Sequence, residues 1–342
     1  MIRRLLVCVV LGLAVFWASA ADAQRQSTQW LNAVLRNSIR ITVVSGRITN
    51  TTGWAFGNRT HRYQSGAAKE EISFQGNGAT GSVHCERTNA EEQFTMELAS
   101  DGRFSIHRTP KNGSTALPIQ FVQAPGEPIS LTVGPEGKQT VYRASTLWHL
   151  LLTQREPCRQ HLLPTLETVP GCEQIATTAT AVESELLKAA NTGKLPDRQH
   201  WNDLVQQLGD NQFAKREAAD RLLRAVGPSL LCYLEQLDYG QLDAEQQFRV
   251  RRIQESLRGQ AVGDTPEHVA AQLVADPLVW LALLDRPEGS TRRVAAKQLA
   301  GLLGEPIGID PAADPASQSS QREQLRAKLE PPKPETKTAP KP

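Results

Sequence analysis

The sequence predicts an α+β chain. An N-terminal antiparallel β domain, arranged as a meander or a sandwich, precedes an α-helical region with HEAT-like repeats and a disordered tail. Three observations indicate this order. Apolar residues alternate with polar ones in short runs up to about residue 143, recur at helical spacing from Ser145, and become rare beyond residue 308. The 342 residues suffice for two domains, and an aromatic content of 5% favours helices packed through aliphatic side chains.

The first 23 residues have the three parts of a secretory signal peptide. Arg3 and Arg4 form a positive n-region, residues 5–16 are apolar, and small residues follow at 18–23. The apolar run is short for a bilayer, so a retained anchor is the weaker alternative, and no later run of about 18 apolar residues occurs. We therefore expect an exported, soluble protein, periplasmic or extracellular, with no integral membrane segment after cleavage.

Short alternating runs predict the β domain over residues 24–144, with a short helix near Trp30 at its start. The runs predicted as strands are 39–43, 72–74, 94–98, 104–106, 119–121, 129–133 and 140–142. Turn sequences separate them, for example at residues 100–102 and 134–137. Residues 45–70 are rich in Gly, Asn and Thr, which indicates a long loop or an irregular edge. We expect either a sandwich or a curved open sheet.

Helical spacing predicts a connector over residues 145–193 and a second helical region over residues 194–308. Within that region, Asp243 and Gln246 have the spacing of a capping box. Thr265, followed by a proline, has the pattern of an N-cap with a first-turn proline. We therefore expect one helix to begin at each of these two caps.

One pattern occurs twice in the helical region. Residues 215–227 read KREAADRLLRAVG, and residues 292–304 read RRVAAKQLAGLLG. The alignment places these residues together: Arg216 and Arg293, Ala218-Ala219 and Ala295-Ala296, Leu222 and Leu299, Gly227 and Gly304. Paired alanines let two helices approach closely, leucine fills the seam, and glycine ends the helix. Because one such unit cannot bury its apolar face alone, we expect neighbouring units to stack.

These residues resemble the HEAT-repeat family of helical solenoids, and most closely the HEAT-like modules of exported bacterial proteins. The likeness rests on Phe213-Ala214-Lys215-Arg216-Glu217-Ala218-Ala219 after an acidic loop, and it covers about residues 200–306, roughly a third of the chain. The two copies lie 77 residues apart, whereas the usual repeat length is about 40. The resemblance implies an extended surface that docks other proteins.

The predicted function is non-enzymatic: an exported scaffold that binds an unidentified protein of the cell envelope through its helical surface. The candidate protein-contact residues are Arg216, Arg221, Arg224, Arg292, Arg293 and Lys297. For each of them, an ordinary solvated helix face is the alternative. The alternative function is small-molecule or lipid binding by the β domain, and a deep apolar pocket beside Trp148 would distinguish it.

No catalytic motif and no cofactor site is predicted. The chain has no G-x-S-x-G and no phosphate-binding glycine loop with its lysine. A dyad of His84 and Cys85 is disfavoured because neighbours on a strand point to opposite faces. Cys158 and His161 lack the second ligand pair that structural zinc needs, so no metal is predicted. The formal charge of +2 gives no electrostatic reason to expect nucleic acid.

Four cysteines follow the leader. Cys158 and Cys172 flank one short helical segment and are the candidate disulfide of an exported protein, with buried unpaired thiols as the alternative. Cys232 lies in an apolar helix and is expected to be a buried thiol. Residues 309–342 lose apolar content and end in prolines and lysines, which predicts a disordered basic tail and its contact with anionic envelope polymers.

Overall fold

The computed structural model describes residues 30, 33–66, 68–111, 116–192, 196–259 and 263–329. The chain divides into two compact units, the first ending at Thr178 and the second beginning at Ala179. An antiparallel β region followed by helices makes the chain α+β, as predicted. The predicted helical connector does not form a part of its own, because the division falls inside it. The predicted signal peptide and residues 330–342 lie outside the described residues.

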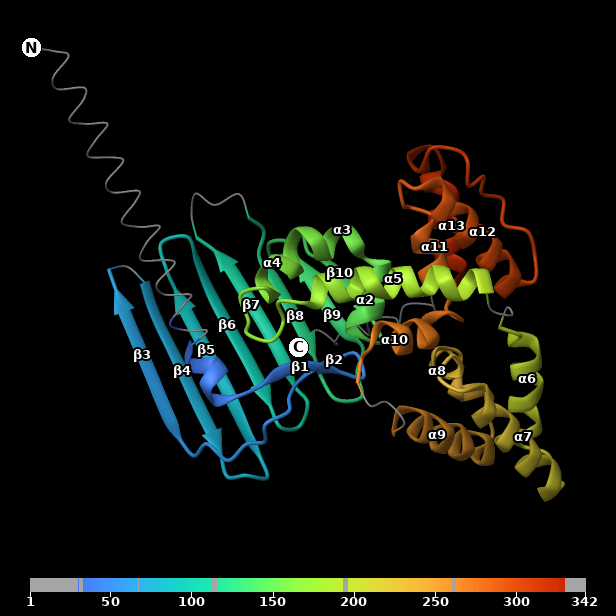
Figure 1. Cartoon of the computed structure of the whole chain (residues 1–342), viewed down its shortest axis with the longest axis horizontal. Helices are drawn as coiled ribbons and strands as arrows, with labels where there is room; N and C mark the ends of the chain where they lie inside the picture. The colour runs from blue at the N-terminus through green and yellow to red at the C-terminus, as the bar shows by residue number, and fades with distance from the viewer. Residues whose placement is uncertain are drawn as a thin grey trace, which may run out of the picture. The chain divides into compact units, whose positions relative to one another are not determined.

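An eight-stranded antiparallel meander forms most of the first unit (Figure 1). Its strands are β3 (Arg59–Ser65), β4 (Ala68–Gly76), β5 (Gly81–Thr88), β6 (Glu92–Ala99), β7 (Phe104–Pro110), β8 (Ile119–Gln123), β9 (Ile129–Val133) and β10 (Thr140–Ala144). Each strand pairs with the next one in the chain. A separate ribbon consists of β1 (Ile41–Val44) and β2 (Arg47–Asn50). Of the two predicted arrangements, the open sheet is the one observed.

Each run predicted as a strand overlaps one of these strands, but the sequence missed β2, β3 and β5. β2 and β3 lie in the stretch predicted as a loop or an irregular edge. β3 is the edge strand of the meander, and its side chains are mostly exposed, so no apolar alternation marks it. β5 has a buried arginine, Arg87, where an apolar residue would continue the alternation.

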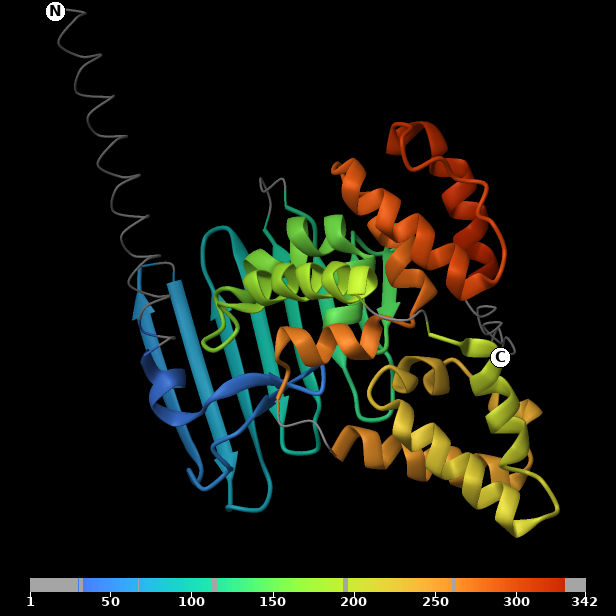
Figure 2. The ribbon, with the colours of Figure 1, turned by 45° about the vertical axis from the view of Figure 1, so that its right-hand side comes forward.

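One face of the meander is apolar and buried. The side chains on this face, each at most 1% exposed, are Ile72, Phe74, Val83, Cys85, Phe94, Met96, Leu98, Phe104, Ile106, Phe121, Ile129 and Leu131. The β1–β2 ribbon and the helices α2 (Leu147–Thr153), α3 (Arg155–Pro157) and α4 (Leu163–Leu166) lie on the same side of the sheet in both views (Figure 1, Figure 2). A π-helix, η1 (Cys158–Leu162), joins α3 to α4. Gln123 ties the ribbon to the sheet by exchanging two hydrogen bonds of 2.9 Å with the backbone of Ile48.

The second unit is helical. Its elements are α5 (Ile175–Thr192), which begins in the first unit, then α6 (Arg198–Gln207), α7 (Phe213–Val226), α8 (Leu230–Glu235), the 3-10 turn η2 (Tyr239–Gln241), α9 (Ala244–Gly259), α10 (Pro266–Leu273), α11 (Pro277–Leu283), α12 (Gly289–Leu303), the 3-10 turn η3 (Pro315–Gln318) and α13 (Ser319–Leu329). Asp243 and Gln246 form the predicted capping box, with reciprocal bonds of 2.9 and 2.8 Å. The hydroxyl of Thr265 caps α10. Both predicted helix starts are confirmed.

The predicted disordered tail begins too early at residue 309. Residues 315–329 form η3 and α13, and α13 contacts α11. Arg322 of α13 forms an ion pair of 2.6 Å with Asp285. None of the side chains of α13 is buried, so polar contacts rather than an apolar face hold the helix in place. A search for apolar periodicity therefore does not find it.

Candidate functional site

The repeated sequence forms helices α7 and α12, which are anchored in the same way. The Nη1 atom of Arg216 donates to the carbonyl oxygens six and five residues earlier, those of Asp210 at 2.8 Å and Asn211 at 3.3 Å. The Nη1 atom of Arg292 donates to the carbonyls at the same two relative positions, at 2.9 and 2.6 Å. In both copies an arginine in the first turn thus closes the loop that precedes its helix.

This equivalence corrects the sequence alignment by one residue. Arg216 corresponds to Arg292, not to Arg293. The same shift pairs buried residues, each 0% exposed: Ala219 with Ala295, and Leu223 with Leu299. The terminal glycines misled the alignment, because α12 has 15 residues before Gly304 and α7 has 14 before Gly227.

Helix α5 covers the second copy. Glu183 accepts hydrogen bonds of 2.8–3.0 Å from the guanidinium of Arg286. The carbonyl oxygen of Ala190 accepts a bond of 2.9 Å from Nε2 of Gln298, which is 3% exposed. At the equivalent position of the first copy stands Leu222, which is 51% exposed. Among the described residues, the first copy therefore has no cover at this position like the one that α5 gives the second copy.

The exposed side of α7 combines small side chains with one apolar and one basic residue. Ala214, Ala218 and Leu222 follow one another at intervals of four residues, and Arg221 and Ala225 lie beside them with the same interval. No hydrogen bond or ion pair of the Arg221 side chain occurs within the part of the chain that the structure describes. We refer to these five residues as the α7 face.

Four of the six predicted contact residues form hydrogen bonds or ion pairs within the fold. Arg216 and Arg292 close the two loops. Arg224 pairs with an aspartate one turn earlier on α7, at 2.5 Å, and Arg293 donates to a carbonyl one turn earlier on α12, at 3.2 Å. Two of the six are exposed and have no hydrogen bond or ion pair to any described residue: Arg221 and Lys297. The sequence prediction missed Leu222 as a surface residue, because the alignment matched it with buried Leu299.

Ion pairs fix the opposite side of α7 against α9. Arg249 of α9 donates to Glu217 of α7 at 2.8 Å and to Glu245 of its own helix at 2.6 Å. The Nε atom of Arg216 lies 3.4 Å from the carboxylate of Glu245. At the start of α7, the backbone N–H of Gln212 is the main cause that lowers the pKa of Asp210. These contacts hold α7 in one orientation and leave the α7 face exposed.

The four described cysteines are free and buried. Burial raises the pKa of the Cys85, Cys158 and Cys172 thiols to about 12, and that of Cys232 well above its ordinary value. The predicted disulfide between Cys158 and Cys172 is therefore not present in the structure. Cys232 is a buried thiol, as predicted. Thiols with such pKa values stay protonated near neutral pH, which deprives them of nucleophilic character.

The candidate dyad of His84 and Cys85 is separated by the sheet. Cys85 lies on the buried face, whereas Nδ1 of His84 lies 3.3 Å from the carboxylate of Glu97 on the other face. Among the described residues, no cluster of three or more His, Cys, Asp or Glu could hold a metal ion. Within those residues, the structure brings together neither a thiol–imidazole pair at these positions nor a metal site.

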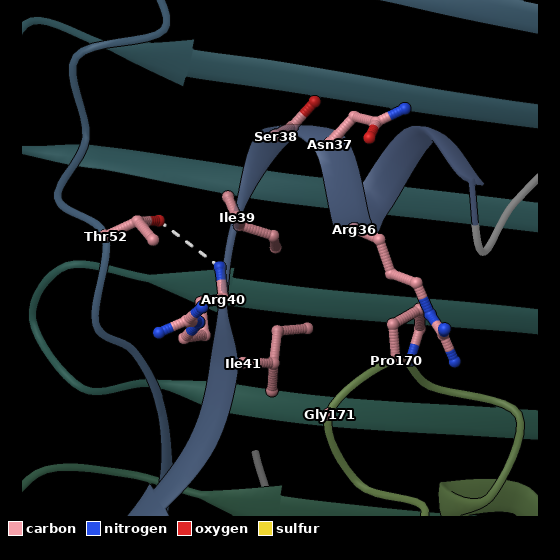
Figure 3. Close-up of a pocket in the computed structure, with 9 residues that line it drawn as sticks. All are labelled: Arg36, Asn37, Ser38, Ile39, Arg40, Ile41, Thr52, Pro170 and Gly171. Carbon is pink, nitrogen blue, oxygen red and sulfur yellow. Dashed lines mark hydrogen bonds between the residues drawn. The ribbon is translucent and has the colours of Figure 1, made fainter.

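A groove in the first unit has a volume of about 370 Å³ (Figure 3). It is lined by Arg36, Asn37, Ser38, Ile39, Arg40, Ile41, Thr52, Pro170 and Gly171. Arg36 forms an ion pair of 2.6 Å with Glu173, and the backbone N–H of Arg40 donates to the hydroxyl of Thr52 at 3.2 Å. Its exposed rim is polar, whereas Ile39 and Ile41 in its lining are buried.

An apolar ligand pocket beside Trp148 was the distinguishing feature of the alternative function. Trp148 and Leu150 of α2 are buried, and Phe121 and Leu131 of the sheet are fully buried. None of these four residues lines the groove of Figure 3.

No family model, no curated protein and no solved structure matches the chain. The HEAT-like resemblance therefore rests on the quoted residues and on the common build of α7 and α12. Within the described residues, no helix is both long enough and apolar enough to cross a membrane.

Proposed function

We propose that this protein is a non-enzymatic binding protein of the cell envelope that docks a helix of a partner protein on the α7 face. The observation that carries the proposal is the exposure of Leu222 at the position where α5 covers the second copy. Units of HEAT-like repeats stack because one pair of helices cannot bury its apolar surface alone. The envelope location rests on the predicted signal peptide.

Helix α5 indicates the kind of partner that fits. Its buried residues are small or aliphatic, as at Val182, Leu186 and Ala190, and its Glu183 pairs with an arginine. The α7 face offers small residues and Arg221, which pairs with no described residue. We therefore infer a partner helix with small and aliphatic residues and an acidic residue placed to meet that arginine.

The outer side of the preceding helix suggests that the complex is exchangeable. The exposed residues of α6 are polar, among them Gln199, Asn202, Asp203 and Gln206. A polar rim around a small apolar centre is typical of interfaces between proteins that also exist apart. The docking is thus expected to be reversible rather than permanent.

Site-specific photo-crosslinking in the intact envelope tests this proposal. A photoreactive residue at position 222 should give one protein adduct, and the same residue at position 297 should not. Once the adduct is identified by mass spectrometry, Leu222→Glu should weaken binding of the purified partner about tenfold or more. A buried leucine contributes about 1.5–3 kcal/mol, which corresponds to at least that factor.

The control is Phe248→Glu, which also places a glutamate at an exposed apolar position, on α9. It should leave the affinity unchanged. Identical adducts from positions 222 and 297, or a Leu222→Glu variant that binds like the unmodified protein, would show that the α7 face is not the docking site.

A further inference from the structure

An ionic cluster interrupts the apolar face of the meander. It lies where β5 and β7 end and β6 begins. Arg87, Phe94 and Arg108 are register partners on β5, β6 and β7. Glu92 lies two residues before Phe94 and therefore on the same face. The Nη2 atom of Arg87 donates to one carboxylate oxygen of Glu92 at 2.8 Å, and Nε of Arg108 donates to the other at 2.6 Å.

Arg87 is the unusual member of this cluster. Its side chain is 7% exposed, and its guanidinium carbon lies 4.9 Å from the centre of the Phe94 ring. The Nε atom of Arg87 is buried and has no hydrogen-bond partner among the described residues. A buried charged donor without an acceptor is costly, so a ligand that supplied an acceptor to this guanidinium would be stabilised.

A cavity of about 230 Å³ opens onto this cluster. Its lining consists of Arg87, Glu91, Glu92 and Arg108 from the sheet side, and Pro164, Thr165 and Thr168 from α4 and the turn after it. Within the described residues, each of the two arginines donates a single hydrogen bond, and both bonds go to Glu92. Because an arginine has several further N–H groups, this wall of the cavity is rich in unused donors.

The opposite wall supplies acceptors. The hydroxyl of Thr165 donates to the carbonyl oxygen of His161 at 3.1 Å, and the hydroxyl of Thr168 donates to the carbonyl oxygen of Thr165 at 2.8 Å. Both hydroxyl hydrogens are thus engaged, and the lone pairs of both oxygens can accept a hydrogen bond. A ligand that spans the cavity needs an anionic acceptor at one end and a hydroxyl donor at the other.

We propose that this cavity binds a small hydroxylated carboxylate. Its carboxylate accepts from the free N–H groups of Arg87 and Arg108, and its hydroxyl donates to Thr165. Arg–carboxylate pairs are favoured by the planar, forked geometry of both groups. Glu92 accepts from both arginines, and buried Glu70 on β4 is the register partner of Arg87. Because these carboxylates already offset the charge of the two arginines, a singly charged ligand is held at lower cost than a doubly charged phosphate. This site is in the first unit and does not depend on the α7 face.

Calorimetric titration of the full chain tests the proposal. Sodium gluconate and sodium glucuronate should bind saturably at low ionic strength, acetate should bind more weakly because it has no hydroxyl, and neutral glucose should not bind. The absence of saturable binding by both hydroxylated carboxylates at millimolar concentrations would overturn the proposal. So would phosphate binding more tightly than either of them.

Variants locate the binding. Arg108→Gln should weaken gluconate binding about tenfold or more, since a hydrogen bond to a charged group contributes about 1.5–3 kcal/mol. The matched control is Arg103→Gln, the same change at an exposed arginine that pairs with Asp101 outside the cavity. Thr165→Val keeps the shape and the ionic cluster, so it should weaken gluconate but not acetate. If Arg108→Gln lowers the melting temperature strongly, Thr165→Val is the variant that tests whether gluconate binds in this cavity. Unchanged gluconate affinity in Thr165→Val would rule out the proposed orientation, and unchanged affinity in a folded Arg108→Gln would rule out the site.

Discussion

At the scale of single residues, the hydrogen-bond partners of an arginine decide whether it stabilises the fold or is exposed on the surface. Arg292 lies on the inner side of α12 and donates to three carbonyl oxygens, two in the preceding loop and that of Pro311. Arg293, the next residue, is exposed and reaches only a carbonyl of its own helix. The sequence treats both as candidate contact residues, because a long side chain near the start of a helix is compatible with either orientation.

The two neighbouring arginines should therefore differ in their effect on stability. Arg292→Ala leaves three carbonyl groups without a charged donor, and we expect it to lower the free energy of unfolding by about 2–3 kcal/mol. Arg293→Ala should lower it by less than about 0.5 kcal/mol. Urea unfolding followed by circular dichroism measures both. Equal losses would mean that the three hydrogen bonds of Arg292 do not stabilise the second unit more than the single bond of Arg293.

At the scale of elements, the turn between α4 and α5 packs with its backbone directly against the backbone of strand β1. Gly171 in this turn has φ +91°, and a Cβ there would lie 2.0 Å from the carbonyl oxygen of Ile41. The carboxylate of Glu173 accepts a hydrogen bond of 2.8 Å from the N–H of Gly171 and forms an ion pair with Arg36. Figure 3 labels Arg36 and Gly171. Burial acts to raise the pKa of Glu173, but its hydrogen bonds to backbone N–H groups and to Arg36 lower it. The stabilisation is therefore present above the ordinary pKa of a glutamate and is lost as the pH falls through the lowered value.

Gly171→Ala should destabilise the first unit more than Gly126→Ala does. Both glycines have a positive φ, but only Gly126 has free space around the place of a Cβ. Gly126 has φ +73° and no atom within 4 Å of the place that a Cβ would take, so Gly126→Ala bears only the cost of the left-handed conformation, about 1–2 kcal/mol. Gly171→Ala adds a clash with backbone and should lower the melting temperature further. Thermal unfolding followed by tryptophan fluorescence compares the two variants. Equal decreases would contradict the close approach to β1.

At the scale of the whole molecule, the second unit extends into the stretch that composition marks as a tail. The carbonyl of Pro311 meets Arg292, and Arg322 of α13 meets Asp285 in the loop after α11. Both are polar contacts between segments whose own composition gives no apolar signal. The C-terminal boundary of the unit therefore depends on the partners that these residues find in the fold.

A chain that ends at Gly308 should lose protection around α11 and α12, whereas a chain that ends at Leu329 should keep it. The shorter chain leaves Arg292 and Asp285 without these partners, and a loss of about 1 kcal/mol would lower the melting temperature by about 2–4 °C. Hydrogen exchange measured by mass spectrometry localises the effect. If both chains exchange alike in α11 and α12, α13 is not part of the second unit.

The sequence by itself determined the α+β class, seven of the strands and the caps that begin α9 and α10, because apolar periodicity and capping are local properties of the chain. It did not reveal β5 or the ionic cluster, because Arg87 and Glu92 are charged residues on a face that an apolar alternation would mark. It did not reveal the extent of α13, because Arg322 takes its role from Asp285, a distant partner in the sequence. Only the tertiary structure decided that Arg292 is the counterpart of Arg216, and that Leu222 is exposed where Gln298 is covered. Burial depends on what packs against a residue, and a local pattern does not contain that neighbour.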